Sequence, residues 1–350
     1  MRIPEPLKPG DTIAIVAPSF GATTDPYTFR FEEAVRQFKN RGYRVVIGDC
    51  CYKSDGLGIS THPATAAQEL MYYYMNPDIH AVFSCGGGEL MCETAQYIDF
   101  EMLRSAPAKW FLGYSDNTNF IFPLVTLCNT AALYGPNAPG FGKPWEQAEY
   151  YVWDILEGKT DTVHGYEMFQ NPDVESEDPL SPYILTDTKE LTVYVPDEKN
   201  PGTLKKLVDS EQLTISGTIL GGCLDCINGL SGTPFENVKD FNLNHKNVIW
   251  TLECCDYNPM DIRRALWHLK QCGWFKNASG FVFGRPLAAF RQEMMGVNQY
   301  NAVTGILEDF GVPVIFDADF GHIDPVMPLI IGADATVKVK GDDISIKFNI

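Results

Sequence analysis

The chain has 350 residues, of which 45% are hydrophobic and 21% are charged, and its formal net charge is -18 at pH 7. This is the composition of a globular protein long enough to form two domains. The acidic balance disfavours binding to nucleic-acid polymers and to anionic membrane surfaces, because both are negatively charged themselves. No apolar run approaches the roughly 18 residues that a membrane-spanning helix needs, so we expect no membrane partner.

The first half of the chain alternates between apolar runs typical of buried strands and stretches with helical periodicity. The expected strands are 12–17, 43–48, 81–84, 110–112 and 131–134. The expected helices are 26–42, 63–75 with a cap near Thr61, and 117–127 opened by Asp116 or Asn117. Such alternation predicts a parallel sheet covered by helices, with ligands held at the carboxyl ends of the strands.

The pattern changes between about residues 144 and 212. A helix is expected over 145–158, but 171–181 is acidic, contains proline and shows no clean period, which is typical of a linker or an elaborated loop. We therefore expect an N-terminal domain over 1–165, a linker over 166–212 and a C-terminal domain over 213–350.

The C-terminal part again alternates between strand and helix patterns. The expected strands are 214–220, 248–252, 279–283 and 312–317, and the expected helices are 259–272 and 296–310. Residues 221–223 are interpreted as a tight turn, and 335–340 with 344–349 as a β-hairpin. These elements predict a second, smaller α/β domain with a mixed sheet.

The stretch from Lys109 to Phe120 combines an apolar run, a sharp turn and a helix, with Ser115 at the turn. In such an elbow the apical side chain is exposed, and the first amide N–H groups of the helix face the atom that it attacks. Gly113 matches the first glycine of G-x-S-x-G, but Asn117 replaces the second. The stretch suits a nucleophile, and the alternative is a serine that only helps to cap a helix.

A nucleophilic serine needs a general base, and the base needs a carboxylate that orients it. Of the six histidines, only His322 follows a strand and a Phe-Gly pair in a loop rich in functional residue types. Glu253 ends the apolar run 248–252, where an unpaired buried carboxylate would be strongly destabilising. A histidine would satisfy this carboxylate, so His322 and Glu253 are the candidates for base and orienting acid.

Three consecutive glycines, 86–88, follow an expected strand but lack the G-x-G-x-x-G spacing of a dinucleotide site. Glycine lets the backbone approach a substrate closely, so an amide in this turn and the N–H of Asp116 are candidates for an oxyanion hole. The alternative is a tight turn with no catalytic role.

Cysteine usage favours a reducing compartment. Most of the ten cysteines lie inside apolar segments, and the adjacent pairs 50–51 and 254–255 lack the spacing of a zinc site. We therefore expect no structural metal. Residues 1–20 do not show the basic and apolar regions and cleavage site of a signal peptide, so we expect a cytoplasmic location.

Taken together in chain order, these motifs resemble the LD-carboxypeptidase family of serine peptidases, which includes a microcin C immunity branch. The matching segments are LKPGDTIAIVAPS, FSCGGG, KWFLGYSDNT, LYGP, GTILGG, GLSGTPFE, RALWHLKQCGWF, VPVIFDADFGH and PLIIGADATV. The resemblance covers nearly the whole chain apart from the middle segment.

The resemblance implies a triad of Ser115 as nucleophile, His322 as base and Glu253 as orienting acid, with the Gly88 and Asp116 amides as the oxyanion hole. It also implies a Rossmann-like N-terminal domain, a swivelling C-terminal β/α domain, and an active site between them. A homodimer is expected, and neither a metal nor an organic cofactor. The candidate substrate contacts are Gly87, Asn117 and Cys223.

Two substrate classes follow from the resemblance. Typical members cleave the L,D amide bond to a terminal D-alanine in murein tetrapeptides during cell-wall recycling. The immunity branch cleaves a carboxamide that joins an amino acid or peptide to a nucleotide-like group, and the long segment between 136 and 217 resembles that branch. However, Cys223 replaces the asparagine of a frequent Gly-Gly-Asn motif, and no basic residue lies between Glu253 and Arg263 to bind a phosphate. The prediction is therefore a serine carboxypeptidase that acts on muropeptides, with the immunity-like amidase as the alternative.

Two further alternatives belong to other classes. One is a catalytically inactive protein of the same fold that binds an acyl-peptide; the complete set of serine, histidine and glutamate argues against it. The other is a cysteine enzyme that uses Cys85, which lies before the glycine turn without an assigned histidine.

Overall fold

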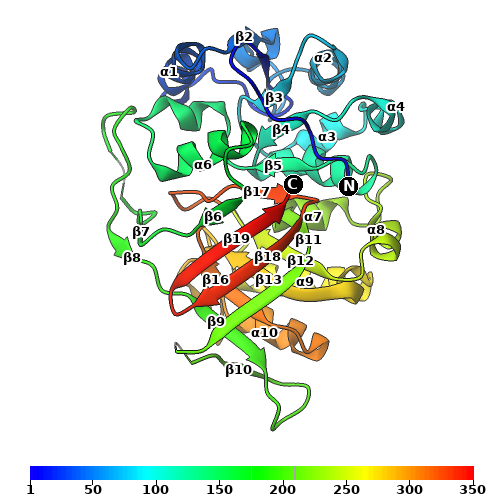
Figure 1. Ribbon diagram of the computed structural model, residues 1–350, viewed down its shortest axis with the longest axis vertical. Coiled ribbons are helices and arrows are strands. Elements are labelled where there is room, and N and C mark those ends of the chain that lie inside the picture. The colour runs from blue at the N-terminus through cyan, green and yellow to red at the C-terminus, as the bar shows by residue number, and fades with distance from the viewer. Residues whose placement is uncertain (175, 209) are drawn as a thin grey trace.

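The computed structural model describes residues 1–174, 176–208 and 210–350. Within these residues, two large sheets lie one beyond the other along the long axis of the molecule (Figure 1). The first, six-stranded, has the order β17-β5-β4-β3-β1-β2, and the second, nine-stranded, has the order β10-β9-β16-β13-β12-β11-β18-β19-β6. This arrangement confirms the expected α/β fold with a parallel sheet in the N-terminal half.

The first sheet is parallel except at its β17 edge. Its N-terminal strands are β1 Thr12–Val16, β2 Arg44–Ile47, β3 Ala81–Ser84, β4 Trp110–Gly113 and β5 Ala132–Tyr134. The intervening helices are α1 Tyr27–Asn40, α2 Pro63–Met75, α3 Met91–Ala95, α4 Phe100–Ser105 and α5 Thr118–Thr126. The strand order reverses at β1, and ligands of such sheets bind in the crevice beyond the carboxyl strand ends at the reversal.

The second sheet has a parallel centre, from β11 through β12 and β13 to β16, flanked by antiparallel strands. Its strands are β6 Thr162–His164, β9 Thr192–Pro196, β10 Leu204–Lys206, β11 Gln212–Cys223, β12 Val248–Glu253, β13 Ala278–Gly284, β16 Val314–Ala318, β18 Asp334–Lys340 and β19 Asp343–Asn349. Its helices are α7 Leu224–Leu230, α8 Val238–Asn244, α9 Pro259–Gln271 and α10 Asn301–Leu307. The mixed sheet and the C-terminal hairpin are thus as expected.

The middle of the chain contributes to the second sheet rather than forming only a connection. It supplies β6, β9 and β10, with helix α6 Gln147–Leu156 before them and the small pair β7 Met168–Phe169 and β8 Asp187–Thr188 between them. β6 lies inside the expected N-terminal domain by number but pairs with β19. The division of the chain at residues 165 and 212 stays a prediction.

Residues 221–223 are not a tight turn, as the sequence analysis expected, but the end of strand β11. Gly221 and Gly222 have φ values of 157° and 136° and lie against the neighbouring strand and the elbow helix. A Cβ added at Gly221 would lie 1.8 Å from the carbonyl oxygen of Thr251, and one at Gly222 would lie 2.9 Å from Thr118. These glycines therefore permit close backbone approach within a strand.

One helix start differs from expectation. The helix expected from residue 296 begins at Asn301, because 293–294 and 297–298 pair as strands β14 and β15 around Met295 and Gly296, both at positive φ. Helix α2 starts at Pro63 as expected, and its cap near Thr61 is His62, whose ring Nδ1 accepts the N–H of Ala64.

Strand β17 Leu329–Ile331 returns the C-terminal half of the chain to the first sheet, where it pairs with β5 (Figure 1). Helix α5 packs against the second half as well, and the ring of Phe122 stacks on Trp274 at a centroid distance of 5.4 Å. One continuous apolar cluster includes residues from both sheets. The carboxyl ends of β4 and β12 are thereby brought to one place.

Candidate active site

Ser115 follows β4 in a strained turn. Its φ is 63°, in the left-handed region that residues other than glycine rarely adopt. A short 3₁₀ turn, Ser115–Asn117, connects it to α5. This is the strand–turn–helix arrangement of a nucleophile elbow, which exposes the serine hydroxyl at the edge of the sheet.

The structure brings Ser115, His322 and Glu253 together in one chain of hydrogen bonds. His322 Nε2 lies 2.8 Å from the Oγ of Ser115, and His322 Nδ1 lies 2.7 Å from Oε2 of Glu253. An ionised carboxylate can only accept, so Nδ1 donates to Glu253 and leaves Nε2 to accept the serine proton. Glu253 ends β12 and His322 follows β16, whereas Ser115 comes from the first sheet.

The environment keeps Glu253 ionised and makes His322 a stronger base. Burial raises the pKa of Glu253, but the adjacent His322 and the hydroxyl of Tyr134 lower it further, so its pKa lies below the ordinary value. Burial lowers the pKa of His322, but the charge of Glu253 and the side-chain hydrogen bonds to Glu253 and Cys255 together raise it, so its pKa lies well above 6.5. The pair therefore favours the imidazolium that forms when the histidine accepts a proton.

The glycine turn lies beside the nucleophile. A Cβ added at Gly87 would lie 3.3 Å from the Oγ of Ser115. Gly88, at φ 156°, packs against Ser19, and a Cβ added there would lie 2.2 Å from the Ser19 hydroxyl. Among the described residues, the N–H of Gly88 has no hydrogen-bond acceptor, so it is free to bind a ligand oxygen.

Asn117, one of the two residues expected there, occupies the N-cap position of helix α5 without a side-chain hydrogen bond, whereas the carboxylate of Asp116 joins the elbow to the glycine turn. One oxygen accepts from the Ser19 hydroxyl at 2.5 Å and from the N–H of Met91 at 2.9 Å, and the other accepts from Asn119 at 2.8 Å. Burial raises the pKa of the Asp116 carboxyl group, and these donors oppose that effect by stabilising the ionised form. They also hold the backbone of residue 116 against the loop that follows β3.

Asn117 and Cys223 face the interior. The Asn117 amide donates to the carbonyl oxygen of Gly86 at 2.9 Å and to Asn137 at 3.1 Å. Cys223 is 2% exposed, and its N–H donates to Thr118. Burial of both side chains favours a structural role, so their assignment as substrate contacts stays a prediction that the geometry does not support.

Tyr134, the last residue of β5, belongs to the site but was not among the residues predicted from the sequence. Its hydroxyl donates to Oε1 of Glu253 at 2.5 Å and accepts the N–H of Ser115 at 3.1 Å. The side chain is fully buried. Its position at the carboxyl end of the strand next to β4 was the available signal, because such strand ends meet at one edge of a parallel sheet.

Asp225, at the start of α7, is a second residue that sequence reasoning missed. Its carboxylate accepts the N–H groups of Cys255, Asp256 and Tyr257, at 3.2, 3.1 and 3.1 Å. It thereby shapes the loop that follows Glu253. The thiol of Cys255 lies beside His322 in this loop, and burial raises the pKa of that thiol.

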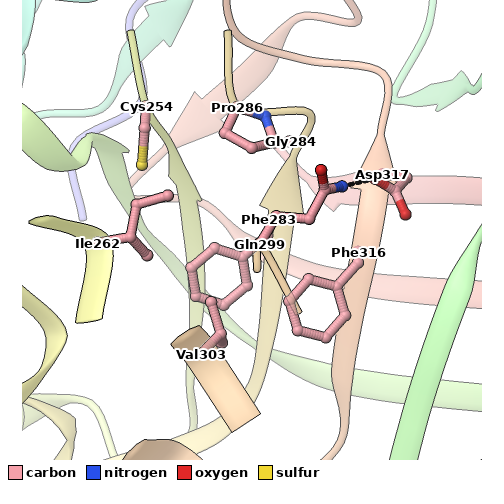
Figure 2. A pocket seen from close by; sticks show the side chains of 9 residues that line it. All are labelled: Cys254, Ile262, Phe283, Gly284, Pro286, Gln299, Val303, Phe316 and Asp317. Carbon is pink, nitrogen blue, oxygen red and sulfur yellow. Dashed lines mark hydrogen bonds between the residues drawn. The ribbon is translucent and has the colours of Figure 1, made fainter. Parts of the chain in front are cut away.

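A small cavity of about 10 Å³ lies behind this loop in the second half of the molecule (Figure 2). Its lining is mostly apolar, with Phe283 and Phe316 on one side, and Gln299 donates to Asp317 at 2.8 Å at its polar end. Burial raises the pKa of Asp317 to about 6. A space of this volume holds about one water molecule, so it is not a substrate site.

Within the described part of the chain, no group of three or more histidine, cysteine, aspartate or glutamate side chains is arranged to hold a metal ion. No helix in that part is long and apolar enough to cross a membrane.

Two family models match the chain on either side of its middle segment. The model of the LD-carboxypeptidase N-terminal domain matches residues 13–135, and the model of the LD-carboxypeptidase C-terminal domain matches residues 216–337. The first match includes Ser115, and the second includes Glu253 and His322.

Curated relatives align over almost their whole lengths. A putative carboxypeptidase of Vibrio cholerae is 25% identical, over 95% of this chain and 93% of the relative. The microcin C7 self-immunity protein MccF of Escherichia coli is 24% identical, over 97% and 94%. A probable murein peptide carboxypeptidase of Bacillus subtilis is also 24% identical, over 95% and 91%.

Solved structures show the same fold. MccF in complex with aspartyl sulfamoyl adenosine matches with a TM-score of 0.80 at 21% identity, covering 99% of this chain and 98% of that chain. A muramoyltetrapeptide carboxypeptidase from Oxalobacter formigenes matches with a TM-score of 0.70 at 19% identity, covering 97% and 99%. At these identities the likeness establishes the fold alone.

Proposed function

This chain belongs to the LD-carboxypeptidase family of serine peptidases, and we propose that Ser115, His322 and Glu253 form its catalytic triad. The observation that carries the proposal is the unbroken hydrogen-bond chain from the serine hydroxyl through the imidazole to the carboxylate. A protein that only bound an acyl-peptide would have no use for this alignment. The proposed reaction is hydrolysis of an amide by acyl transfer.

In the proposed mechanism, His322 takes the proton of Ser115 as the serine oxygen attacks the carbonyl carbon of the scissile amide. Glu253 stabilises the imidazolium and holds the ring in position. His322 then gives the proton to the leaving amine, and a water molecule activated by the same imidazole hydrolyses the acyl-enzyme.

The amides of Gly88 and Asp116 are the proposed oxyanion hole. The N–H of Ser115 is not available for this role, because it donates to the hydroxyl of Tyr134. The N–H of Gly88 has no acceptor among the described residues, and the carboxylate of Asp116 anchors its own backbone beside the same turn. Loss of one such donor typically costs about 3 kcal/mol of transition-state stabilisation.

The proposed substrate is a murein tetrapeptide that ends in D-alanine, whose L,D amide bond is cleaved in cell-wall recycling. Likeness to a probable murein peptide carboxypeptidase supports this choice. So does the loop after Glu253, which carries no basic residue before Arg263 to receive a phosphate. The proposed setting is the cytoplasm, because a reducing compartment suits ten free cysteines; a homodimer stays a prediction.

The second candidate is an amidase that cleaves aminoacyl or peptidyl nucleotide conjugates. The observation that favours it is the closer superposition on MccF than on the muramoyltetrapeptide carboxypeptidase, with TM-scores of 0.80 and 0.70. Both candidates use the same triad and oxyanion hole. They differ only in the leaving group.

The decisive experiment compares two substrates, a murein tetrapeptide ending in D-alanine and an aminoacyl sulfamoyl adenosine, by mass-spectrometric detection of products. Release of D-alanine by the wild type is expected, and Ser115→Ala is expected to lower kcat by about 10⁴-fold or more. The matched control, Ser105→Ala, changes an exposed serine that donates only within its own helix, and should keep wild-type activity.

The other outcomes separate the alternatives. Cleavage of the adenosine conjugate alone would assign the immunity-like activity. Cleavage of neither substrate by a folded wild-type enzyme would favour the acyl-peptide-binding protein. Undiminished activity of Ser115→Ala would refute the triad.

A further inference from the structure

The hydroxyl of Tyr134 lies between the nucleophile and the orienting acid of the proposed triad. It donates to Oε1 of Glu253 at 2.5 Å and accepts the backbone N–H of Ser115 at 3.1 Å. Tyr134 ends a strand of the first sheet, and Glu253 ends a strand of the second. One buried phenol thus connects the two sheets at the centre of the site.

We propose that Tyr134 is a positioning residue whose hydroxyl holds the Glu253 carboxylate and the strained backbone of Ser115 in catalytic register. This inference rests on the proposed triad and extends it by one residue. Tyr134 touches neither the hydroxyl of Ser115 nor the imidazole through these bonds, so its effect on the reaction passes through its two partners.

Glu253 is fully buried, so both oxygens of its carboxylate need hydrogen-bond donors from the protein. Its Oε2 accepts from His322, and its Oε1 accepts from Tyr134. Without the phenol, Oε1 would have no hydrogen-bond donor among the described residues, because the nearby thiol of Cys223 donates to Asp225 at 3.3 Å. A buried carboxylate with a missing donor either moves to find another or takes up a proton, and both would disturb the orientation of His322.

The hydroxyl of Tyr134 also holds the backbone of Ser115. Its φ of 63° is unfavourable for a residue with a side chain, and such a conformation persists only where the surroundings hold it. The proton of the phenol points to Glu253, so the lone pairs of the oxygen remain to accept the N–H of Ser115. The same hydroxyl therefore stabilises the elbow and the carboxylate, and coordinates their positions.

The phenol of Tyr134 stays protonated, and its backbone is fixed in the sheet. Burial, together with the charge of Glu253, raises the pKa of Tyr134 well above 10, so the hydroxyl keeps its proton over the range in which His322 acts as base. Tyr134 pairs with Leu329 of strand β17, seven residues after His322 in the chain. Its backbone is thus held by the segment that also carries the base (Figure 1).

The test is Tyr134→Phe, which retains the ring and removes only the hydroxyl. The expected result is a kcat about 10- to 100-fold lower with little change in KM. This is the effect expected when a buried hydrogen bond to a charged group is lost and that group stabilises the transition state. Without its donor, Glu253 binds protons more readily and attracts a proton on His322 more strongly. The acid limb of the pH profile of kcat/KM should therefore move to higher pH.

The matched control is Tyr74→Phe. Tyr74 is also fully buried and donates a single hydrogen bond, to the carbonyl oxygen of Lys109, but it lies in α2. Its loss should change thermal stability without changing kcat or the acid limb. A Tyr134→Phe enzyme that is less stable but has the kcat and pH profile of the wild type would overturn the inference, since that is the signature of a purely structural tyrosine.

A second variant covers the case in which Tyr134→Phe does not fold. Incorporation of 3-fluorotyrosine at position 134 makes the phenol a stronger donor and a weaker acceptor without changing its shape. The acid limb should then move to lower pH, opposite to the phenylalanine variant, and an unchanged limb would count against the proposal. Ser115→Ala, assayed in parallel, distinguishes failure of the proposed triad from failure of the role proposed for Tyr134. Retained activity of Ser115→Ala would refute the triad itself, whatever the result for Tyr134.

Discussion

The imidazole of His322 lies between two groups that favour opposite protonation states of the ring. Ser115 needs a neutral Nε2 that can accept a proton, and Glu253 is best satisfied by a charged ring. Burial lowers the pKa of His322, but Glu253, together with the hydrogen bond to Cys255, raises it well above 6.5. At residue scale, the proposed base is therefore strong because of its partner and not because of its exposure.

This balance predicts the effect of Glu253→Gln. The substitution removes the charge that raises the pKa of His322, while burial continues to lower it. Because the base works only when neutral, activity is lost as pH falls through the pKa of His322, and the acid limb of kcat/KM should move to lower pH. The value of kcat should fall on the order of 10³- to 10⁴-fold, because the ring loses its oriented tautomer.

Steady-state kinetics from pH 5 to 9 would measure both effects. Glu293→Gln, a change at an exposed glutamate on β14, serves as the control and should leave the profile unaltered. An acid limb that stays in place in the Glu253→Gln enzyme would mean that this carboxylate does not set the pKa of the base.

At the scale of elements, the site depends on how the loop after β1 and the glycine turn after β3 fit against the elbow after β4. Phe20 N–H donates to the carbonyl oxygen of Gly87 at 3.0 Å, and the adjacent Ser19 donates to Asp116. Gly88 fills the small space between these contacts. The position of the proposed oxyanion donors is thus determined by three loops together.

Gly88→Ala should therefore weaken catalysis more than folding. The added Cβ would lie 2.2 Å from the hydroxyl of Ser19, so Ser19 must move away from Asp116, and the backbone at φ 156° is strained as well. We expect kcat to fall about 100-fold, the size of effect seen when one oxyanion donor is displaced.

Kinetics and thermal unfolding would be measured together for this variant. Gly229→Ala is the control, because a Cβ there meets no atom within 4 Å and the residue lies inside α7. That variant should keep its kcat and gain up to about 1 kcal/mol of stability. Wild-type kcat in Gly88→Ala would show that this turn contributes no oxyanion donor.

For the molecule as a whole, a buried ionic cluster joins the middle segment to the loop between strand β16 and His322. Asp319 is fully buried and accepts from Arg285 at 2.6 Å and from the N–H of Tyr166 at 2.9 Å, with Lys189 at 3.4 Å. Tyr166 and Lys189 belong to the segment expected to be a linker. The cluster therefore anchors that segment to the body of the protein.

Asp319→Ala should destabilise the protein by about 3 to 5 kcal/mol, because it leaves two buried cations without their shared partner. Urea unfolding followed by tryptophan fluorescence would measure the change. Asp309→Ala, which breaks a more exposed pair with Lys270 at 2.6 Å, should cost less than about 1 kcal/mol. Equal effects of the two substitutions would contradict the role given to the buried cluster.

Local sequence patterns were enough to predict the helices and strands that have one face in the apolar core and the other in water. Periodicity located β1 to β5, α1, α2 and the C-terminal hairpin, because burial of one face is written into the spacing of apolar residues. The same reasoning identified Ser115, at a turn, and Glu253, at the end of an apolar strand, as candidate catalytic residues. The structure brings both to His322.

Which buried polar groups contact one another depends on the tertiary structure. Tyr134 and Glu253 are 119 residues apart and come into contact because strands of two different sheets end at one place. In the same way, the two glycines at the end of β11 were predicted to form a turn. The close contacts with neighbouring elements that require glycine there are visible only in the folded protein. Periodicity reports that a residue is buried, but the identity of its partner depends on strand order and on the packing of the two sheets, which no local pattern encodes.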